Sequence, residues 1–312
     1  MTFARGAASG ETIRMLPVLA RSVLALSVLA TSVLALSACT GSDAGRERAA
    51  PAQSRADAKV EPELPGDPIR GLAILTAFRD SLPTHSGNAL RCTSCHLDNG
   101  TRPSAMPWLG SAGRYPRYRS RPGYEETLAR RVNECIARSL AGKMLPEAGR
   151  EMRDILAYLE SLRARPRPGA LDSVLLRGVA DRGRQEYAAT CSRCHGTQGE
   201  GSAQAPAVWG AGSFSIGAGL ARQNTMATFV RHNMPFDHLV TLSDQQAADI
   251  AAYVISMPRQ DHPGKERDWP NADPPSDVAY ATAAARAKGN PLPPTRPVLP
   301  RRVSPDSAVT PR

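Results

Sequence analysis

Apolar side chains between residues 66 and 165 recur at the spacing of amphipathic α-helices. Asp67 and Pro68 suit the N-cap and the first position of an opening helix. A middle helix is expected over residues 125–141 and a closing helix over about 147–163, with loop-rich sequence around them. The apolar faces of these helices are Ile69, Leu72 and Leu75, then Leu128, Val132, Cys135 and Ile136, then Met152, Ile155, Leu156, Leu159 and Leu162.

The same succession of helix, loop-rich middle and closing helix returns between residues 170 and 258. A helix is expected over residues 182–189, and the closing helix begins at Ser243, with Gln246 three residues later as the partner in a capping box. A break with two prolines, at residues 163–169, separates the units. The fold class is therefore expected to be all-α, with two tandem domains over residues 66–165 and 170–258.

Each unit contains one Cys-x-x-Cys-His motif, the attachment signal of a c-type haem. In such a site two thiols form thioethers to the macrocycle and the adjacent histidine ligates iron. A zinc site is the alternative, but zinc ribbons place their cysteine pairs roughly 15–20 residues apart, and these pairs lie in different units. We expect two haem c groups in class I cytochrome c-like domains, attached at Cys92 and Cys95 with His96 as ligand, and at Cys191 and Cys194 with His195.

The N-terminal segment has the pattern of an export signal, an apolar run over residues 23–38 after a basic segment. The run ends in Leu36-Ser37-Ala38-Cys39, which looks like a bacterial lipobox. Residues 1–38 are therefore expected to be removed as a signal peptide, and Cys39 to be lipidated. An uncleaved membrane anchor is the alternative, although about 16 apolar residues are short for a span. With Thr40 next, we expect an exported, periplasmic protein anchored to the outer membrane.

Composition predicts flexible segments outside the two units. Residues 39–65 have the composition of a tether, and residues 259–312 form a Pro-rich tail, expected to be disordered after about residue 280. Aromatic residues make up only 5% of the chain, and haem would supply part of the missing apolar surface. The net charge of +10 favours anionic substrates or acidic partners. Export argues against nucleic acid as a partner.

Each haem needs a second axial ligand or an open position. In the second unit the candidate is Met234, which precedes Pro235 in a loop before the closing helix. Class I cytochromes place their ligand methionine in such a loop. His232, His238 and Met226 are the rivals.

In the first unit the candidates are Cys135 and Met144. Of the six cysteines, Cys135 is the one with neither a haem-attachment nor an export role. It lies on the apolar face of the middle helix, where a free cysteine is also common as a buried core residue. Met144 lies just before the closing helix, so spacing alone leaves both candidates open.

Longer stretches resemble the dihaem thiosulfate dehydrogenases, over nearly all of residues 68–280. The stretch that contains Arg131, Cys135 and Ser139 is much more specific than the haem motifs alone. The resembling stretches are Cys92-Thr-Ser-Cys-His-Leu-Asp-Asn-Gly-Thr101, Gly113-Arg-Tyr-Pro-Arg-Tyr-Arg119, Arg131-Val-Asn-Glu-Cys135-Ile-Ala-Arg-Ser139, Phe229-Val-Arg-His-Asn-Met-Pro235 and Gly264-Lys-Glu-Arg-Asp-Trp-Pro270.

The resemblance implies a site and a reaction. In that family the cysteine matching Cys135 is the distal ligand of the catalytic haem, and the residues matching Arg121, Arg131 and Ser139 line the substrate pocket. The implied reaction joins two thiosulfates into tetrathionate, or runs in reverse. Electrons then pass through the methionine-ligated haem to a soluble or membrane-bound redox partner.

The two ligand types predict the direction of electron flow. A thiolate lowers the potential of the first haem and a thioether raises that of the second, so electrons are expected to pass from the first to the second. Some family members carry Lys where this chain has Asn233, and there Lys and Met exchange as ligands. Asn does not ligate in that way, so no such exchange is expected here.

The charge of the substrate independently favours a cationic pocket. Bringing two dianions to about 5 Å costs roughly 13 kcal/mol at an effective dielectric of about 20. Arg131, Cys135 and Ser139 are one helical turn apart on one face, and Arg119 and Arg121 come from the preceding loop. Guanidinium groups suit oxyanions, so these arginines are expected to offset the repulsion.

Two other functions fit the haem motifs. A non-catalytic electron carrier of two cytochrome domains would use Met144 and give Cys135 no role. Another sulfur-transforming cytochrome would act on a protein-bound sulfur carrier, which needs a groove for a peptide arm and a partner subunit.

Overall fold

The computed structural model describes residues 65–166, 168–239 and 241–300. The predicted signal peptide, Cys39 and all but the last residue of the tether lie outside the described residues. Within the described ranges, no helix is long and apolar enough to cross a bilayer. Contacts group the described residues into one unit, in which the two domains predicted from the sequence are called the first and the second half.

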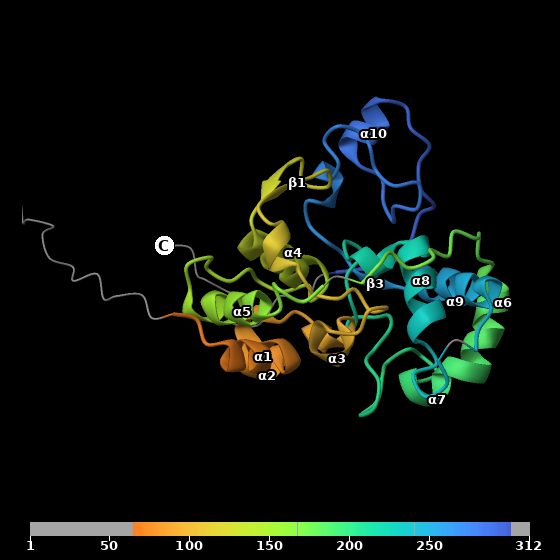
Figure 1. The fold of residues 1–312 in the computed structure, drawn as a ribbon. Helices are drawn as coiled ribbons and strands as arrows, with labels where there is room; N and C mark the ends of the chain where they lie inside the picture. Colours follow the sequence, from red (N-terminus) through yellow and green to blue (C-terminus); the bar gives the residue numbers. More distant parts are fainter. Residues whose placement is uncertain (1–64, 167, 240, 301–312) are drawn as a thin grey trace, which may run out of the picture. The chain divides into compact units, whose positions relative to one another are not determined.

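The first half begins at a capped helix, as predicted (Figure 1). The Asp67 side chain accepts hydrogen bonds from the N–H groups of Ile69 and Arg70, and Pro68 occupies the first turn. The elements in order are α1 (Pro68–Thr76), α2 (Phe78–Ser81), η1 (Pro83–His85), η2 (Cys92–Ser94), α3 (Leu97–Gly100), η3 (Ala112–Arg114), β1 (Arg117–Arg119), β2 (Tyr124–Glu126), α4 (Leu128–Arg138) and α5 (Arg150–Ser161).

The second half follows a similar order, and the sequence pattern does not predict its middle helix, α8. The closing helix α9 begins at the predicted capping box, in which Ser243 and Gln246 each bond the other's backbone N–H. The elements in order are α6 (Ala180–Glu186), η4 (Tyr187–Cys191), α7 (Ser192–His195), η5 (Gly219–Ala221), α8 (Gln223–Asn233), α9 (Asp244–Ser256), β3 (Arg259–Gln260), η6 (Lys265–Arg267), α10 (Ala283–Ala287) and β4 (Val298–Leu299).

The same polar contact occurs in each half, where the opening helix crosses the closing helix. Helix α1 packs on α5, and α6 packs on α9. The N–H of Asp67 donates to the carboxylate of Asp154 at 2.8 Å, and the N–H of Val179 donates to that of Asp249 at 2.7 Å. Both aspartates are buried, with 0% and 3% of their surface exposed. The repeat seen in the sequence is therefore also present in the contacts.

Glycine permits both crossings. A Cβ at Gly71 would lie 2.0 Å from the carbonyl oxygen of Asp154, and a Cβ at Gly183 would lie 1.8 Å from that of Asp249. Neither distance is compatible with a side chain, so each half depends on a glycine at the point of closest helix approach.

Hydrogen bonds join the two halves. The Asn88 side chain donates to the carbonyl oxygens of Ser139 and Ser213, at 2.8 and 2.9 Å. The Ser215 hydroxyl donates to the carbonyl of Arg138 at 2.6 Å. Ser139 and Arg138 end helix α4, so the helix that carries Cys135 is anchored to the second half.

Residues 281–300 differ from the predicted disorder. Thr282, 1% exposed, caps α10, and β4 pairs in parallel with β3. The pairing partner of β4 lies far back along the chain, which composition alone does not reveal.

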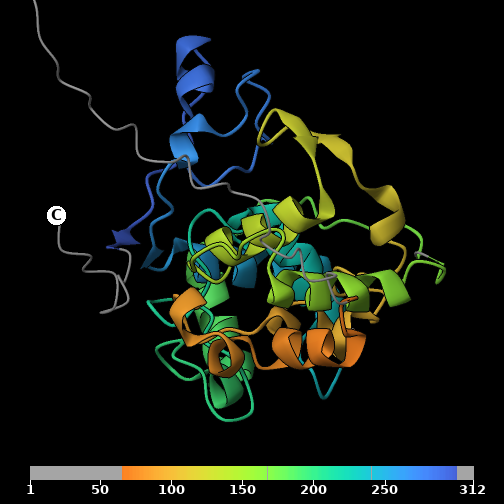
Figure 2. The ribbon, with the colours of Figure 1, turned by 90° about the vertical axis from the view of Figure 1, so that its left-hand side faces the viewer.

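Two small sheets modify the all-α prediction. β1 and β2 form an antiparallel hairpin, and the tail lies beside this hairpin in both views (Figures 1 and 2). There the side chain of Asn271 donates to the hydroxyl of Tyr118 at 2.9 Å. The middle helix is shorter than the expected 125–141 because β2 precedes it and Thr127 caps α4.

Candidate functional site

The first Cys-x-x-Cys-His motif lies on the 3-10 turn η2 rather than at the end of a long helix. Nδ1 of His96 lies 2.6 Å from the carbonyl oxygen of Met106. Because a carbonyl can only accept, Nδ1 carries the proton and Nε2 keeps its lone pair. Burial lowers the pKa of His96 to about 4, so the ring is neutral, the form that ligates metals.

The second motif lies at the end of the continuous helical run α6, η4 and α7, but its histidine makes the same kind of contact. Nδ1 of His195 lies 2.8 Å from the carbonyl oxygen of Pro206, so Nε2 is again left as a lone-pair donor. A Cβ at Gly100 would lie 1.9 Å from the ring of Trp108, and one at Gly199 would lie 2.2 Å from the ring of Trp209. An indole ring therefore packs on a glycine beside each histidine in the same way.

These residues fit covalent haem. All five cysteines of the described ranges are free of disulfides. Both pairs therefore have thiols available for thioether bonds, next to an imidazole with an available Nε2. The first pair lies among partly buried apolar side chains, including Leu97 and Trp108, which suits a macrocycle that is itself apolar.

Cys135 faces the first motif. Burial first, and then the electrostatic influence of Cys135, raises the pKa of Cys95 to about 12. Cys135 is also the main cause that raises the pKa of Arg131, one turn earlier on α4. Ser139, one turn later, caps α4 and donates its N–H to the carbonyl of Cys135 at 2.7 Å. The structure therefore brings Arg131, Cys135 and Cys95 together.

Met144, the rival of Cys135, lies elsewhere. It is 51% exposed and lines a hollow of about 500 Å³ between α4 and the tail. Arg267 and Asp268 of the tail line the same hollow.

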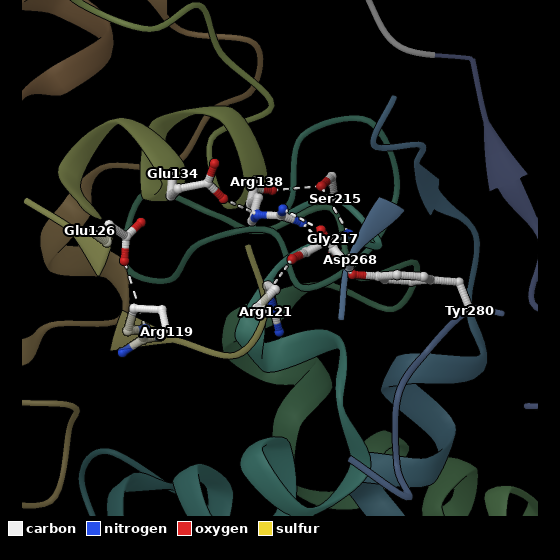
Figure 3. Close-up of polar contacts among 9 residues, drawn as sticks. All are labelled: Arg119, Arg121, Glu126, Glu134, Arg138, Ser215, Gly217, Asp268 and Tyr280. Atoms are coloured by element: carbon white, nitrogen blue, oxygen red, sulfur yellow. Dashed lines mark hydrogen bonds and ion pairs between the residues drawn. The ribbon is translucent and has the colours of Figure 1, made fainter. Parts of the chain in front are cut away.

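Arg121 has a different environment from Arg131. Its guanidinium donates to the carbonyl of Gly217 at 2.9 Å and lies 4.7 Å from the centre of the Trp269 ring. Burial lowers the pKa of Arg121. Its side chain thus bridges the hairpin loop to Gly217 of the second half (Figure 3) and to Trp269 of the tail.

The tail also holds helix α4 through a buried ion pair that the sequence pattern does not predict. Both terminal nitrogens of Arg138 donate to Asp268, at 2.8 and 2.7 Å. Glu134 accepts from the same guanidinium, and the hydroxyl of Tyr280 donates to Asp268 (Figure 3). Arg138 is 7% exposed and Asp268 is 4% exposed, so these charges compensate each other inside the protein.

Met234 is half-buried and is the C-cap of α8, directly after the last helical residue. Its rivals have other environments: Met226 is in the core at 5% exposure, Nε2 of His232 lies 3.0 Å from the carbonyl of Asp172, and His238 is exposed beside Asp237. These contacts favour Met234.

A family model described as cytochrome c oxidase, cbb3-type, subunit III matches residues 178–254, which contain the second haem motif. The thiosulfate dehydrogenase of Psychrobacter arcticus is 40% identical over 223 residues, which make up 67% of this chain and 68% of that protein. The chain belongs to the thiosulfate dehydrogenase family. The thiosulfate dehydrogenase of Allochromatium vinosum is 36% identical over 209 residues, 61% of this chain and 77% of that protein.

Among solved structures, the "as isolated" form of thiosulfate dehydrogenase (TsdBA) from Marichromatium purpuratum is similar, with a TM-score of 0.58 and 29% identity. The similarity covers 62% of this chain and 46% of that one, so the chain spans less than half of that protein's length. Family membership makes the protein an oxidoreductase of the cytochrome c type, with covalent haem c as its prosthetic group.

Proposed function

We propose that this protein is a dihaem cytochrome c that oxidises two thiosulfate dianions to tetrathionate, or runs the reverse reaction. The observation that carries the proposal is the convergence of Arg131 and Cys135 on the first Cys-x-x-Cys-His motif. A cation beside a redox centre is what joining two dianions requires.

The same contacts support the proposed ligand sets. In two tandem class I cytochrome c-like domains, Cys92, Cys95, His96 and Cys135 would hold the first haem, and Cys191, Cys194, His195 and Met234 would hold the second. Haem supplies one-electron redox chemistry, and the protein residues orient, charge and shield it.

The reaction is 2 S2O3(2−) → S4O6(2−) + 2 e−: one sulfur–sulfur bond forms and two electrons leave. The guanidinium of Arg131 is charged at any physiological pH, and so offsets the repulsion between the dianions. Ser139 lies one turn beyond Cys135 and is proposed to donate to the substrate oxygens. Arg121 contributes its charge from the hairpin loop. The two haems would supply one-electron transfer from the substrate to an external redox partner.

The N-terminal prediction remains a proposal: removal of residues 1–38, lipidation of Cys39 and anchoring of an exported, periplasmic protein to the outer membrane. The lipobox pattern at residues 36–39 supports it. Mass spectrometry of the purified protein should find an acylated N-terminal cysteine at position 39. An unmodified N-terminus would rule the anchor out.

The decisive experiment is a thiosulfate-dependent reduction assay on the purified haem protein with an artificial electron acceptor. We expect the haem absorption bands to change to the reduced form on addition of thiosulfate, and tetrathionate to accumulate. Haems that are reduced by dithionite but not by thiosulfate would favour the non-catalytic carrier.

A further inference from the structure

Glu126 is a buried carboxylic acid beside the proposed substrate pocket, and the reaction described above gives it no role. It is the last residue of β2, directly before Thr127, the N-cap of α4. The two residues before it, Tyr124 and Glu125, are exposed, whereas Glu126 is only 2% exposed. The strand therefore turns one of its acidic side chains inward.

The charges around Glu126 come from two elements. Nε of Arg119, on β1, lies 3.7 Å from its carboxylate (Figure 3). From α4, Glu126 faces Arg131, Glu134 and Arg138. Burial is the largest influence and raises the pKa of Glu126, while the arginines oppose this rise. The nearby N-terminus of α4 also favours the ionised form.

Two of these neighbours already satisfy each other. Glu134 and Arg138 are bonded to one another, and Arg138 is bonded to Asp268 as well. Arg119 and Arg131 are therefore the cations that Glu126 shares with an incoming substrate. Arg131 is also the cation that faces Cys135.

We propose that Glu126 is the counter-ion of this pocket in its empty state and takes up a proton when the substrate dianion binds. An ionised Glu126 competes with thiosulfate for Arg119 and Arg131 and repels it, whereas a protonated Glu126 leaves both cations to the substrate. This inference rests on the proposed function and adds a control of substrate affinity by pH.

The sign of the effect follows from linkage. Binding of a dianion raises the pKa of a neighbouring carboxyl group, so the bound state holds more protons than the free state. Affinity for thiosulfate is therefore greatest below the pKa of Glu126 in the free protein. It falls as the pH rises from that value to the pKa in the bound state. The reaction itself releases no proton, so this pH dependence belongs to the protein.

The test compares Glu126→Gln with Glu125→Gln, its exposed neighbour, as the matched control. In the wild type and the control, KM for thiosulfate should rise with pH. Glu126→Gln should remove this rise and lower KM by about tenfold at alkaline pH, because a buried negative charge is lost. Haem absorption spectra should be the same in all three proteins.

Proton uptake gives a second readout that does not depend on turnover. Thiosulfate is added to the fully reduced protein in weak buffer with a pH indicator, so that binding occurs without electron transfer. The wild type and Glu125→Gln should take up protons, and Glu126→Gln should not. If Glu126→Gln does not fold, Glu126→Asp should shift the pH midpoint of KM.

The outcomes separate the two proposals. If thiosulfate does not reduce the oxidised wild-type protein and tetrathionate does not reoxidise the reduced protein, the proposed function fails. If the wild type oxidises thiosulfate but Glu126→Gln keeps its pH profile and its proton uptake, the role of Glu126 alone is overturned.

Discussion

Ser104 and Asn233 hydrogen-bond to each other in both directions across the two halves of the protein. The Ser104 hydroxyl donates to the Asn233 side-chain oxygen at 2.8 Å, and the Asn233 amide donates to the Ser104 carbonyl at 2.9 Å. Asn233 is fully buried and precedes Met234. Ser104 lies two residues before Met106, whose carbonyl holds His96. One side-chain pair thus joins the loops of the two proposed haem sites.

Replacing Asn233 with alanine should lower the free energy of unfolding more than replacing an exposed polar residue does. Asn233→Ala leaves the hydroxyl and carbonyl of Ser104 without this partner in a region with little water. The expected loss is about 1–3 kcal/mol in the free energy of unfolding. Denaturant unfolding of the haem protein measures it, with the exposed Ser202→Ala as the control. A loss no larger than in the control would mean that water replaces the contact.

Cys135→Ser should change the first haem's electronic state and abolish most turnover, because the proposed thiolate ligand is lost. Electron paramagnetic resonance of the oxidised wild type should show a low-spin histidine/thiolate species that the variant lacks. Met144→Leu is the matched control, since Met144 is half exposed and lines a different hollow. The opposite result, with Met144→Leu altering the spectrum and Cys135→Ser leaving it intact, would favour the electron carrier.

Met234→Leu should lower the reduction potential of the second haem, because a thioether stabilises Fe(II). The expected fall is a sizeable part of the range of about 0.8 V that axial ligands span in haem proteins. Redox titration followed in the visible region measures it, and Met226→Leu, a change within the core, is the control. An unchanged potential in Met234→Leu would mean that Met234 is not the ligand and would favour His232 or His238.

Local signals in the sequence predict several elements correctly. The caps at Asp67 and Ser243 lie within a few residues of the groups they bond, so a short window contains both partners. The tail could not be predicted in this way. Arg138 and Asp268 are 130 residues apart in sequence, and a Pro-rich composition gives no sign of such a partner.

The same limit applies to the site. Arg131 and Cys135 share a helix face, so helical spacing suffices to bring them together. The burial of Glu126 could not be predicted in this way, because it depends on a hairpin whose strands are only three residues long. Strands this short show no repeated apolar spacing. An acidic residue directly before a helix cap, with arginines on both sides in the sequence, is the signal that was present.

Replacing Arg131 should lower turnover alone, whereas replacing Arg121 should also lower stability. Arg131→Ala removes the cation beside Cys135, which should cost about 2–4 kcal/mol in the step that joins two sulfurs, roughly 30- to 1,000-fold in turnover. Its unfolding free energy should change little. Arg121→Ala also removes a bond to Gly217 and the contact with Trp269, so it should lose about 1–3 kcal/mol of stability as well. Steady-state thiosulfate oxidation and denaturant unfolding of both variants separate these effects, with haem spectra confirming the cofactor content. Full activity in Arg131→Ala would mean that the anion pocket lies elsewhere, and the substrate assignment would lose its main physical support.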